Sequence, residues 1–161
     1  MLSNFLRKLI FARQFVMANG KVEILGDGYV LLAAPLLTRL QRNEDLGEAI
    51  RAQTSIVAKR LGVLKPADFI KYLKDIFETM GFGSLEVIDI DVGKKRAILR
   101  LRESTLARAA RAGAPAVPQP SCAIAGQVLA GMLTFVFGKK VVAEERDCLA
   151  AGKEYCQFVV K

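Results

Sequence analysis

The sequence predicts an α+β domain in which an antiparallel sheet packs against helices. Stretches around Asn19-Gly20 and Gly93-Lys94 have the pattern of β-hairpins, and helical segments are grouped between them. A long uncharged helix then precedes a final pair of strands. Because the strands occur as hairpins and the helices in groups, an antiparallel sheet is favoured over a parallel one. With 161 residues, 52% of them hydrophobic, the chain is expected to form one domain over residues 1–161.

The first half of the chain begins with a hairpin over residues 9–25, in which Asn19-Gly20 is a type I′ turn. A helix is expected over 29–43, after the turn formed by glycines 26 and 28. Another is expected over 44–63, where apolar residues recur at nearly helical spacing. A third helix over 69–82 carries a broad apolar stripe, for which core packing is the first interpretation.

The second half is expected to contain a hairpin, a short helix, a long helix and two strands, over residues 85–104, 104–112, 121–138, 139–148 and 154–161. Ser121 is a plausible N-cap for the long helix. That helix carries no charge, but it is just shorter than the roughly 20 residues that cross a bilayer. We therefore expect a buried central helix and no membrane span.

Composition excludes several classes of function. The chain contains no histidine, which removes Ser–His and Cys–His nucleophile pairs and imidazole metal ligands. Its net charge of +8 comes from scattered Lys and Arg residues without interleaved aromatics, so no nucleic-acid partner is expected. The basic, apolar N-terminus is interrupted by Arg13 and Gln14 and does not resemble a signal peptide. A cytoplasmic location is therefore expected, where cysteines stay reduced.

The three cysteines fall near one glutamate in the predicted fold. Cys148 and Cys156 flank a turn at Gly152, Glu145 precedes Cys148 by three residues, and Cys122 begins the long helix. Zinc takes four ligands in a tetrahedron, and thiolates and carboxylates both serve. Spacing alone leaves two interpretations open, a zinc site or three structural cysteines. Strict strand alternation would place Glu144, rather than Glu145, on the side of Cys148.

Residues 121–160, SCAIAGQVLAGMLTFVFGKKVVAEERDCLAAGKEYCQFVV, resemble the vinyl-4-reductase domain family. The family signature is an apolar, glycine-containing helix followed by Glu-x-x-Cys, a glycine and Cys-x-Phe. This chain supplies Gly126, Gly131, Glu145, Cys148, Gly152, Cys156 and Phe158 in that order. The resemblance implies a fold similar to small subunits of the vesicle-tethering TRAPP complex. By similarity to the sensor domains of phenol-responsive activators, it also implies structural Zn²⁺ held by Cys122, Glu145, Cys148 and Cys156.

The resemblance further implies a small-molecule pocket between helices and sheet. Inward-facing residues give the expected lining: Phe69, Tyr72, Ile76, Leu99, Leu101, Met132 and Phe135. The phenol sensors hold the phenol hydroxyl with a histidine and a tryptophan, and this chain has neither. A more apolar ligand, such as a hydrocarbon, fits the inventory better, with Tyr72 or an arginine as one polar contact.

Three functions remain to be separated. The first is a zinc-stabilised binding or sensing module that acts as a homodimer, through a signalling partner or its own oligomer. The second is a structural or adaptor protein of the same fold without a ligand. The third is a reductase accessory protein, but Leu31 stands where a G-x-G-x-x-G motif needs its last glycine, so a nicotinamide enzyme is not expected.

Overall fold

The computed structural model describes residues 10–24, 27–32, 46–113 and 122–161. Its elements, in chain order, are β1 (Phe15–Ala18), β2 (Lys21–Ile24), β3 (Asp27–Tyr29), α3 (Leu46–Arg60), the 3-10 helix η1 (Pro66–Phe69), α4 (Ile70–Thr79), β4 (Ser84–Asp91), β5 (Arg96–Arg102), α5 (Thr105–Gly113), α6 (Ala123–Phe137), β6 (Ala143–Asp147), the 3-10 helix η2 (Leu149–Ala151) and β7 (Cys156–Val160). Antiparallel sheets and packed helices confirm the predicted α+β class.

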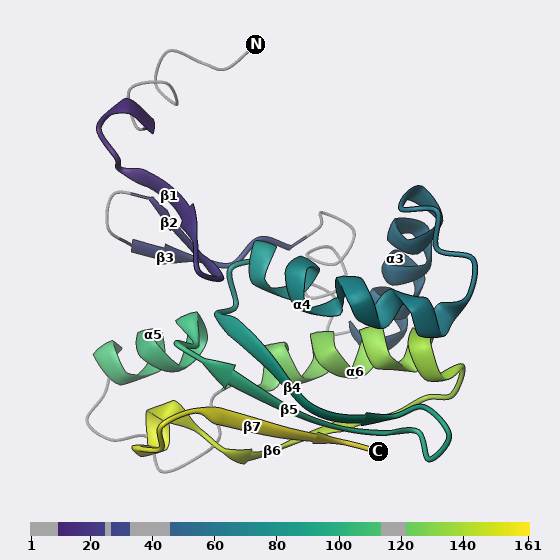
Figure 1. Ribbon diagram of the computed structural model, residues 1–161. Helices are drawn as coiled ribbons and strands as arrows, with labels where there is room; N and C mark the ends of the chain where they lie inside the picture. The colour runs from purple at the N-terminus through teal and green to yellow at the C-terminus, as the bar shows by residue number, and fades with distance from the viewer. Residues whose placement is uncertain (1–9, 25–26, 33–45, 114–121) are drawn as a thin grey trace.

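The strands form two antiparallel sheets. One has the order β1-β2-β3, and the other has the order β4-β5-β7-β6, so the last strand of the chain lies between β5 and β6. In Figure 1 the larger sheet forms the lower layer and α6 runs across it, while the small sheet stands apart at the upper left. The helices therefore cover one face of the larger sheet.

The first hairpin has the predicted turn. Asn19 and Gly20 both have positive φ, 53° and 71°, as a type I′ turn requires. The N–H of Gly83 donates to the carbonyl of Gly20 at 2.9 Å, and a side chain on Gly20 would overlap the Gly83 backbone. Gly20 therefore serves both the turn and the contact that joins the small sheet to the start of β4.

The strand β3 was not predicted. Residues 27–29 pair with β2, whereas the glycines around Asp27 suggested only a turn before a helix. Tyr29 thus ends a strand, residues 30–32 are in neither helix nor strand, and the rest of the predicted helix lies outside the described residues. The third predicted helix is also shorter than expected. It ends at Thr79, because Gly81 and Gly83 adopt positive φ and redirect the chain into β4.

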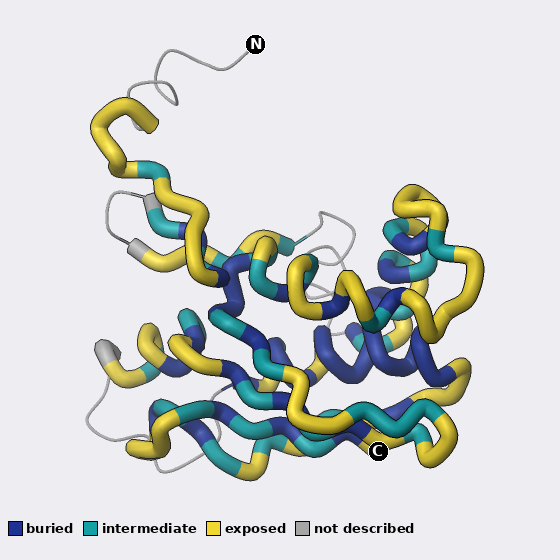
Figure 2. The backbone as a smooth tube through the Cα atoms, in the orientation of Figure 1, coloured by how far each residue is buried: buried dark blue, intermediate teal, exposed yellow. Residues whose placement is uncertain are grey.

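The core lies between the larger sheet and α6. Ala97, Leu99 and Leu101 alternate inward along β5, as predicted, and all three are fully buried. α6 is buried almost all round (Figure 2), which is the environment expected for a helix without charge. Among the described residues, none of the helices has the length and apolar character needed to span a bilayer.

The two central helices approach each other closely. A Cβ on Gly131 of α6 would lie 2.6 Å from Cβ of Ile50 and 2.8 Å from the carbonyl oxygen of Gly47, both on α3. Only glycine leaves room for this crossing. The start of α6 also differs from the prediction, because its N-cap is Cys122 and Ser121 lies outside the described residues.

Candidate functional site: a thiol–carboxylate cluster and an apolar cavity

Three sulfur atoms and one carboxylate converge below the start of α6. Cys122 is the N-cap of α6, Glu145 lies on β6, Cys148 follows β6, and Cys156 begins β7. Their ligand atoms all lie within 4.8 Å of one another. All three cysteines are buried and none forms a disulfide. The four residues named from the sequence as metal ligands therefore come together in space.

A β-bulge decides which glutamate joins the cluster. Glu145 pairs with Phe158, but Asp147 pairs with Gln157, so Arg146 is an extra residue in β6. The bulge breaks strict alternation and puts Glu145 on the same face as Cys148. Glu144 instead points to solvent, where its carboxylate forms ion pairs with Arg146 at 2.7 Å and with Lys161 at 3.6 Å. The expectation from simple alternation, which favoured Glu144, is wrong for this reason.

The spacing of the sulfur atoms suits a tetrahedral ion. Sγ of Cys122 lies 3.6 Å from Sγ of Cys156, which lies 3.9 Å from Sγ of Cys148. Thiolates bound tetrahedrally at about 2.3 Å from Zn²⁺ would be roughly 3.8 Å apart. The side chains thus already have the separations that a zinc ion would need.

The carboxylate of Glu145 has two different oxygens. Oε2 accepts a hydrogen bond from the N–H of Cys122 at 3.0 Å and so caps α6. Oε1 is buried and accepts no hydrogen bond within the described part of the chain. A buried carboxylate oxygen without a partner is costly unless a cation meets it. This observation, with the three sulfurs beside it, shows that the residues present fit a metal ion.

Neighbouring groups orient the thiols. The N–H of Leu149 donates to Sγ of Cys156 at 3.3 Å, and the hydroxyl of Ser104 lies 3.3 Å from Sγ of Cys122. The hydrogen bond with Cys122, together with burial, raises the pKa of the Cys156 thiol. Metal binding would therefore displace protons from the cluster, as it does at thiolate sites in general.

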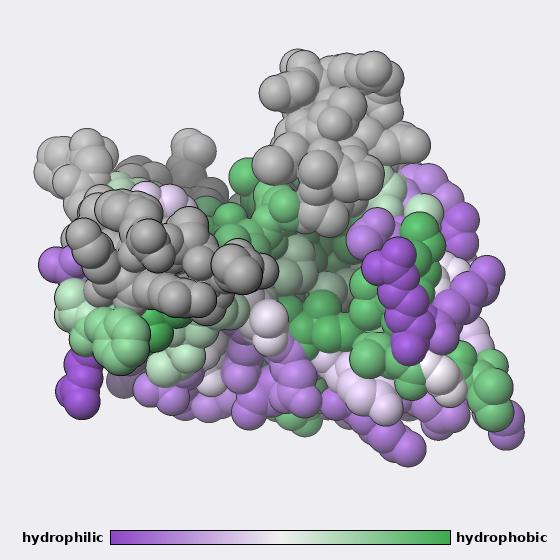
Figure 3. Space-filling model, turned by 90° about the horizontal axis from the view of Figure 1, so that it is seen from above, coloured by the Kyte–Doolittle hydropathy of each residue, from purple (hydrophilic) through white to green (hydrophobic). Residues whose placement is uncertain are grey.

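A separate cavity lies where α3, α4 and α6 meet the segment after β3. Its volume is about 180 Å³ and its wall is mainly apolar, formed by Leu31, Ile50, Gln53, Thr54, Val57, Phe69, Ile76, Met80 and Met132. The N–H of Leu31 donates to the carbonyl of Met80 at 2.7 Å, which joins two parts of this wall. Seen from above, hydrophobic side chains gather toward the middle of the molecule (Figure 3).

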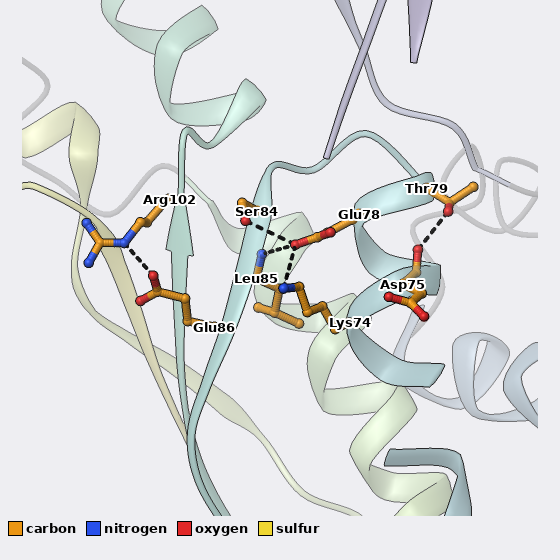
Figure 4. A network of polar contacts seen from close by, with 8 residues as sticks. All are labelled: Lys74, Asp75, Glu78, Thr79, Ser84, Leu85, Glu86 and Arg102. Atoms are coloured by element: carbon orange, nitrogen blue, oxygen red, sulfur yellow. Dashed lines mark hydrogen bonds and ion pairs between the residues drawn. The ribbon is translucent and has the colours of Figure 1, made fainter. Parts of the chain in front are cut away.

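One carboxylate fixes the cavity helix α4 to the larger sheet. Oε1 of Glu78 accepts hydrogen bonds from the hydroxyl of Ser84 at 3.0 Å and from the N–H of Leu85 at 2.9 Å, and Lys74 lies 3.9 Å away (Figure 4). Ile76 and Met80 flank Glu78 along the chain and line the cavity. This network therefore sets the position of two wall residues relative to β4.

The residues expected to line the pocket divide into three groups. Phe69, Ile76 and Met132 line the cavity. Phe135 and Tyr72 do not, but both rings contact Phe69, with centroids 5.6 Å and 6.5 Å away. Leu99 and Leu101 are fully buried under α6, in the core between helix and sheet. Inward orientation on β5 places a residue in this core, whereas the cavity lies on the far side of α6.

Several residues of both sites were not named from the sequence. Ser104 carries an N-cap signal before α5, but its contact with Cys122 depends on the tertiary fold. Ile50 and Val57 belong to the apolar spacing noticed in the second helix, and this spacing was a usable signal. Gln53 and Thr54, the polar part of the wall, gave none.

Comparisons with known proteins agree with this architecture. The family model of the vinyl-4-reductase domain matches residues 102–161. The uncharacterized protein MJ1460 of Methanocaldococcus jannaschii is 29% identical over 119 residues, which are 73% of this chain and 71% of that protein.

Solved structures are similar over most of the chain. The phenol-responsive sensory domain of the transcription activator PoxR, solved with phenol, gives a TM-score of 0.59 at 15% identity and covers 99% of this chain and 91% of its own. A vinyl-4-reductase family protein from Methanocaldococcus jannaschii gives 0.52 at 22%, covering 81% and 82%. A trafficking protein particle complex subunit 3 from Naegleria fowleri, covalently bound to palmitic acid, gives 0.46 at 12%, covering 80% and 82%.

The match to the family model covers the residues that carry the sequence signature, from Glu145 to Phe158. The two structures with the higher TM-scores show the same fold over at least four fifths of the chain. The resemblance to the vinyl-4-reductase family that the sequence predicted is therefore confirmed, in the C-terminal residues by the family match and in the fold by the solved structures.

Proposed function

We propose that this chain is a zinc-stabilised module that binds or senses a small, largely apolar molecule and acts as a homodimer. The observation that carries the proposal is the apolar cavity of about 180 Å³ between α3, α4 and α6. Protein interiors rarely contain voids larger than a water molecule, and an apolar cavity with a few polar groups is a typical binding site. The fold shared with a phenol-responsive sensory domain supports a sensing role.

Zinc would complete the clasp between α6 and the final hairpin. The cluster offers three soft thiolates and one carboxylate, a ligand set that favours zinc over magnesium or calcium. Four protein ligands would fill the tetrahedron and leave no open position for water, so the site would be structural and not hydrolytic. It would hold Cys122, at the start of the helix that carries Met132 into the cavity wall.

Exposed apolar residues near the N-terminal sheet support the homodimer. Val16 and Met17 of the edge strand β1 are exposed, and the side chain of Phe11 is 88% exposed. An unpaired apolar edge strand favours association with another chain. Light scattering at several protein concentrations tests this part of the proposal, and a mass of 17.6 kDa at every concentration would contradict it.

Two measurements on the purified chain test the rest. Elemental analysis should give about one zinc per chain, as a four-ligand structural site requires, and Cys148→Ser should lower it. Native mass spectrometry, followed by extraction, should show a small apolar molecule bound to the protein isolated from its own source. Zinc content far below one per chain would reject the metal. A cavity filled by side chains, with no bound molecule, would favour the adaptor function.

A further inference from the structure

The cavity wall contains only two polar side chains. Of the nine residues that line it, Gln53 and Thr54 carry an amide and a hydroxyl, and none of the nine is charged. An ionised ligand entering this space would lose its hydration without meeting an opposite charge from the wall, which is strongly unfavourable. The wall therefore selects for neutral molecules.

The two polar groups are not equally available. Thr54 is buried, and its hydroxyl donates to the carbonyl of Ile50 at 2.7 Å, within its own helix. Gln53 is half-buried, and its amide makes no hydrogen bond within the described part of the chain. By contrast, the amide oxygen of Gln157 on the sheet accepts a hydrogen bond from Arg100 at 3.2 Å. Gln53 can thus both donate to and accept from a molecule in the cavity.

The volume limits the size of that molecule. Pockets for drug-sized ligands have volumes of roughly 300–1,000 Å³, whereas an apolar cavity of roughly 150 Å³ in another protein holds benzene. At about 180 Å³, this cavity has room for one ring or a similar number of carbon atoms. It has no room for a long hydrocarbon chain.

We propose that Gln53 is the specificity residue of this cavity, and that it selects a neutral molecule of about one ring in size through a single hydrogen-bonding group. The proposal rests on the ligand-binding function proposed above and adds its chemistry. The apolar wall supplies most of the contact, and the Gln53 amide discriminates between ligands that have a polar group and those that do not. An unpaired amide, once covered by an apolar ligand, would lose its contact with water and oppose binding.

Phenol and toluene are suitable probes because they have nearly the same shape and differ in one hydroxyl. Their affinities for the intact, metal-containing chain are measured by isothermal titration calorimetry, with benzoate as the charged probe. Wild-type protein should bind phenol about tenfold more tightly than toluene and benzoate more weakly than either, because one well-made hydrogen bond to a half-buried group is worth roughly that factor. Gln53→Met, which keeps the length of the side chain, should remove this preference and leave the affinity for toluene unchanged.

Two further variants serve as controls. Gln127→Met changes an exposed glutamine on α6 that does not line this cavity, and it should affect no probe. Thr54→Val removes the other polar group and should also have little effect, because its hydroxyl is engaged by the helix backbone. Loss of the phenol preference in Thr54→Val but not in Gln53→Met would assign specificity to the wrong residue here.

The outcomes separate the two proposals. Equal affinity for phenol and toluene, unchanged by Gln53→Met, would overturn the role of Gln53 while the binding function stands. Binding of a long alkane in preference to both rings would overturn the size limit. If folded wild-type protein binds none of the probes, the ligand-binding function itself fails.

Discussion

Glu145 and Cys122 are joined by a hydrogen bond from the backbone N–H of Cys122 to Oε2 of Glu145, at 3.0 Å. The bond lets a carboxylate on β6 cap a helix that begins 23 residues earlier in the chain. Because Oε1 of the same carboxylate is buried among three sulfurs without a hydrogen bond from the described residues, one side chain belongs to both the helix cap and the candidate metal site. Folding of the α6 terminus and metal binding are thereby linked.

Two substitutions of Glu145 should separate these roles. Glu145→Ala removes both the cap and the ligand, and loss of the cap alone should lower the free energy of unfolding by about 1 kcal/mol. Glu145→Gln keeps an oxygen for the Cys122 N–H but removes the charge, so it should keep the cap and lose most of the bound zinc. Urea unfolding with and without a chelator, together with zinc analysis, measures both effects.

The control for Glu145 is its neighbour. Glu144→Ala removes only exposed ion pairs, which contribute little, and should leave zinc content and stability nearly unchanged. In the presence of chelator, Glu145→Gln and wild type should unfold at similar urea concentrations. Equal zinc content in wild type and Glu145→Gln would show that the carboxylate does not bind the metal.

The limits of prediction from sequence are visible at this pair. Residue types and order indicated which cysteines could meet, because a turn at Gly152 returns the chain and the long helix begins at the right place. Nothing in the local pattern shows a bulge at Arg146, so strict alternation favoured the wrong glutamate. Bulges arise from the pairing of two strands, and the sequence of one strand does not reveal them.

The cavity was predictable only in part, for a similar reason. Periodicity identified buried faces, and Phe69, Ile76 and Met132 came from those faces. It could not show which buried faces pack fully together and which leave space. Leu99 fills the core between β5 and α6, whereas the space lies between three helices. Its two polar residues are separated from any motif and become visible only in three dimensions.

Two glycines of α6 should respond oppositely to the same substitution. In Gly131→Ala the new methyl group would meet the stiff side chain of Ile50 and the Gly47 carbonyl, and overpacking should lower the free energy of unfolding by roughly 1–2 kcal/mol. In Gly126→Ala the methyl would lie 3.4 Å from the Phe158 ring, an ordinary contact. There the better helix propensity of alanine should raise stability by about 0.5–1 kcal/mol. Urea unfolding of both variants checks the signs, and stabilisation by Gly131→Ala would contradict the close crossing of α3 and α6.

Ser104 should affect metal affinity without being a ligand. Its hydroxyl accepts a hydrogen bond from the Ala107 N–H at 3.2 Å, which caps α5, and lies 3.3 Å from the Cys122 sulfur. Groups that orient metal ligands typically contribute 10- to 100-fold in affinity. Ser104→Ala should therefore weaken zinc binding about tenfold in a competition with a chromophoric chelator.

The matched control is Ser84→Ala, in which the lost hydroxyl contacts Glu78 and no cysteine. That variant should lose some stability but keep the zinc affinity of wild type. If both serine variants bind zinc equally well, the contact between Ser104 and Cys122 has no role in the metal site.

An ion pair between β2 and the segment after β5 should give a measurable pH dependence. The hydrogen bond from Lys21, followed by its charge and that of Arg108, lowers the pKa of Glu103 from the usual 4.5. A carboxyl whose pKa is lowered on folding adds stability above its unfolded pKa and loses this contribution as the pH falls through the folded value. The stability advantage of wild type over Glu103→Gln should thus be constant at neutral pH, decline below about pH 4.5, and shrink in high salt.

Lys21→Met should remove the same pH-dependent part, since it deletes the other partner of the pair. Protonation of the metal site affects wild type and both variants alike, so the difference between the proteins isolates the ion pair. Urea unfolding between pH 3 and pH 7 measures that difference for each variant. Because both groups are partly exposed, the effect should be small, but its sign is fixed by the direction of the shift. A difference that grew on acidification would mean that Glu103 is destabilised by its surroundings, against the position of Lys21 beside it.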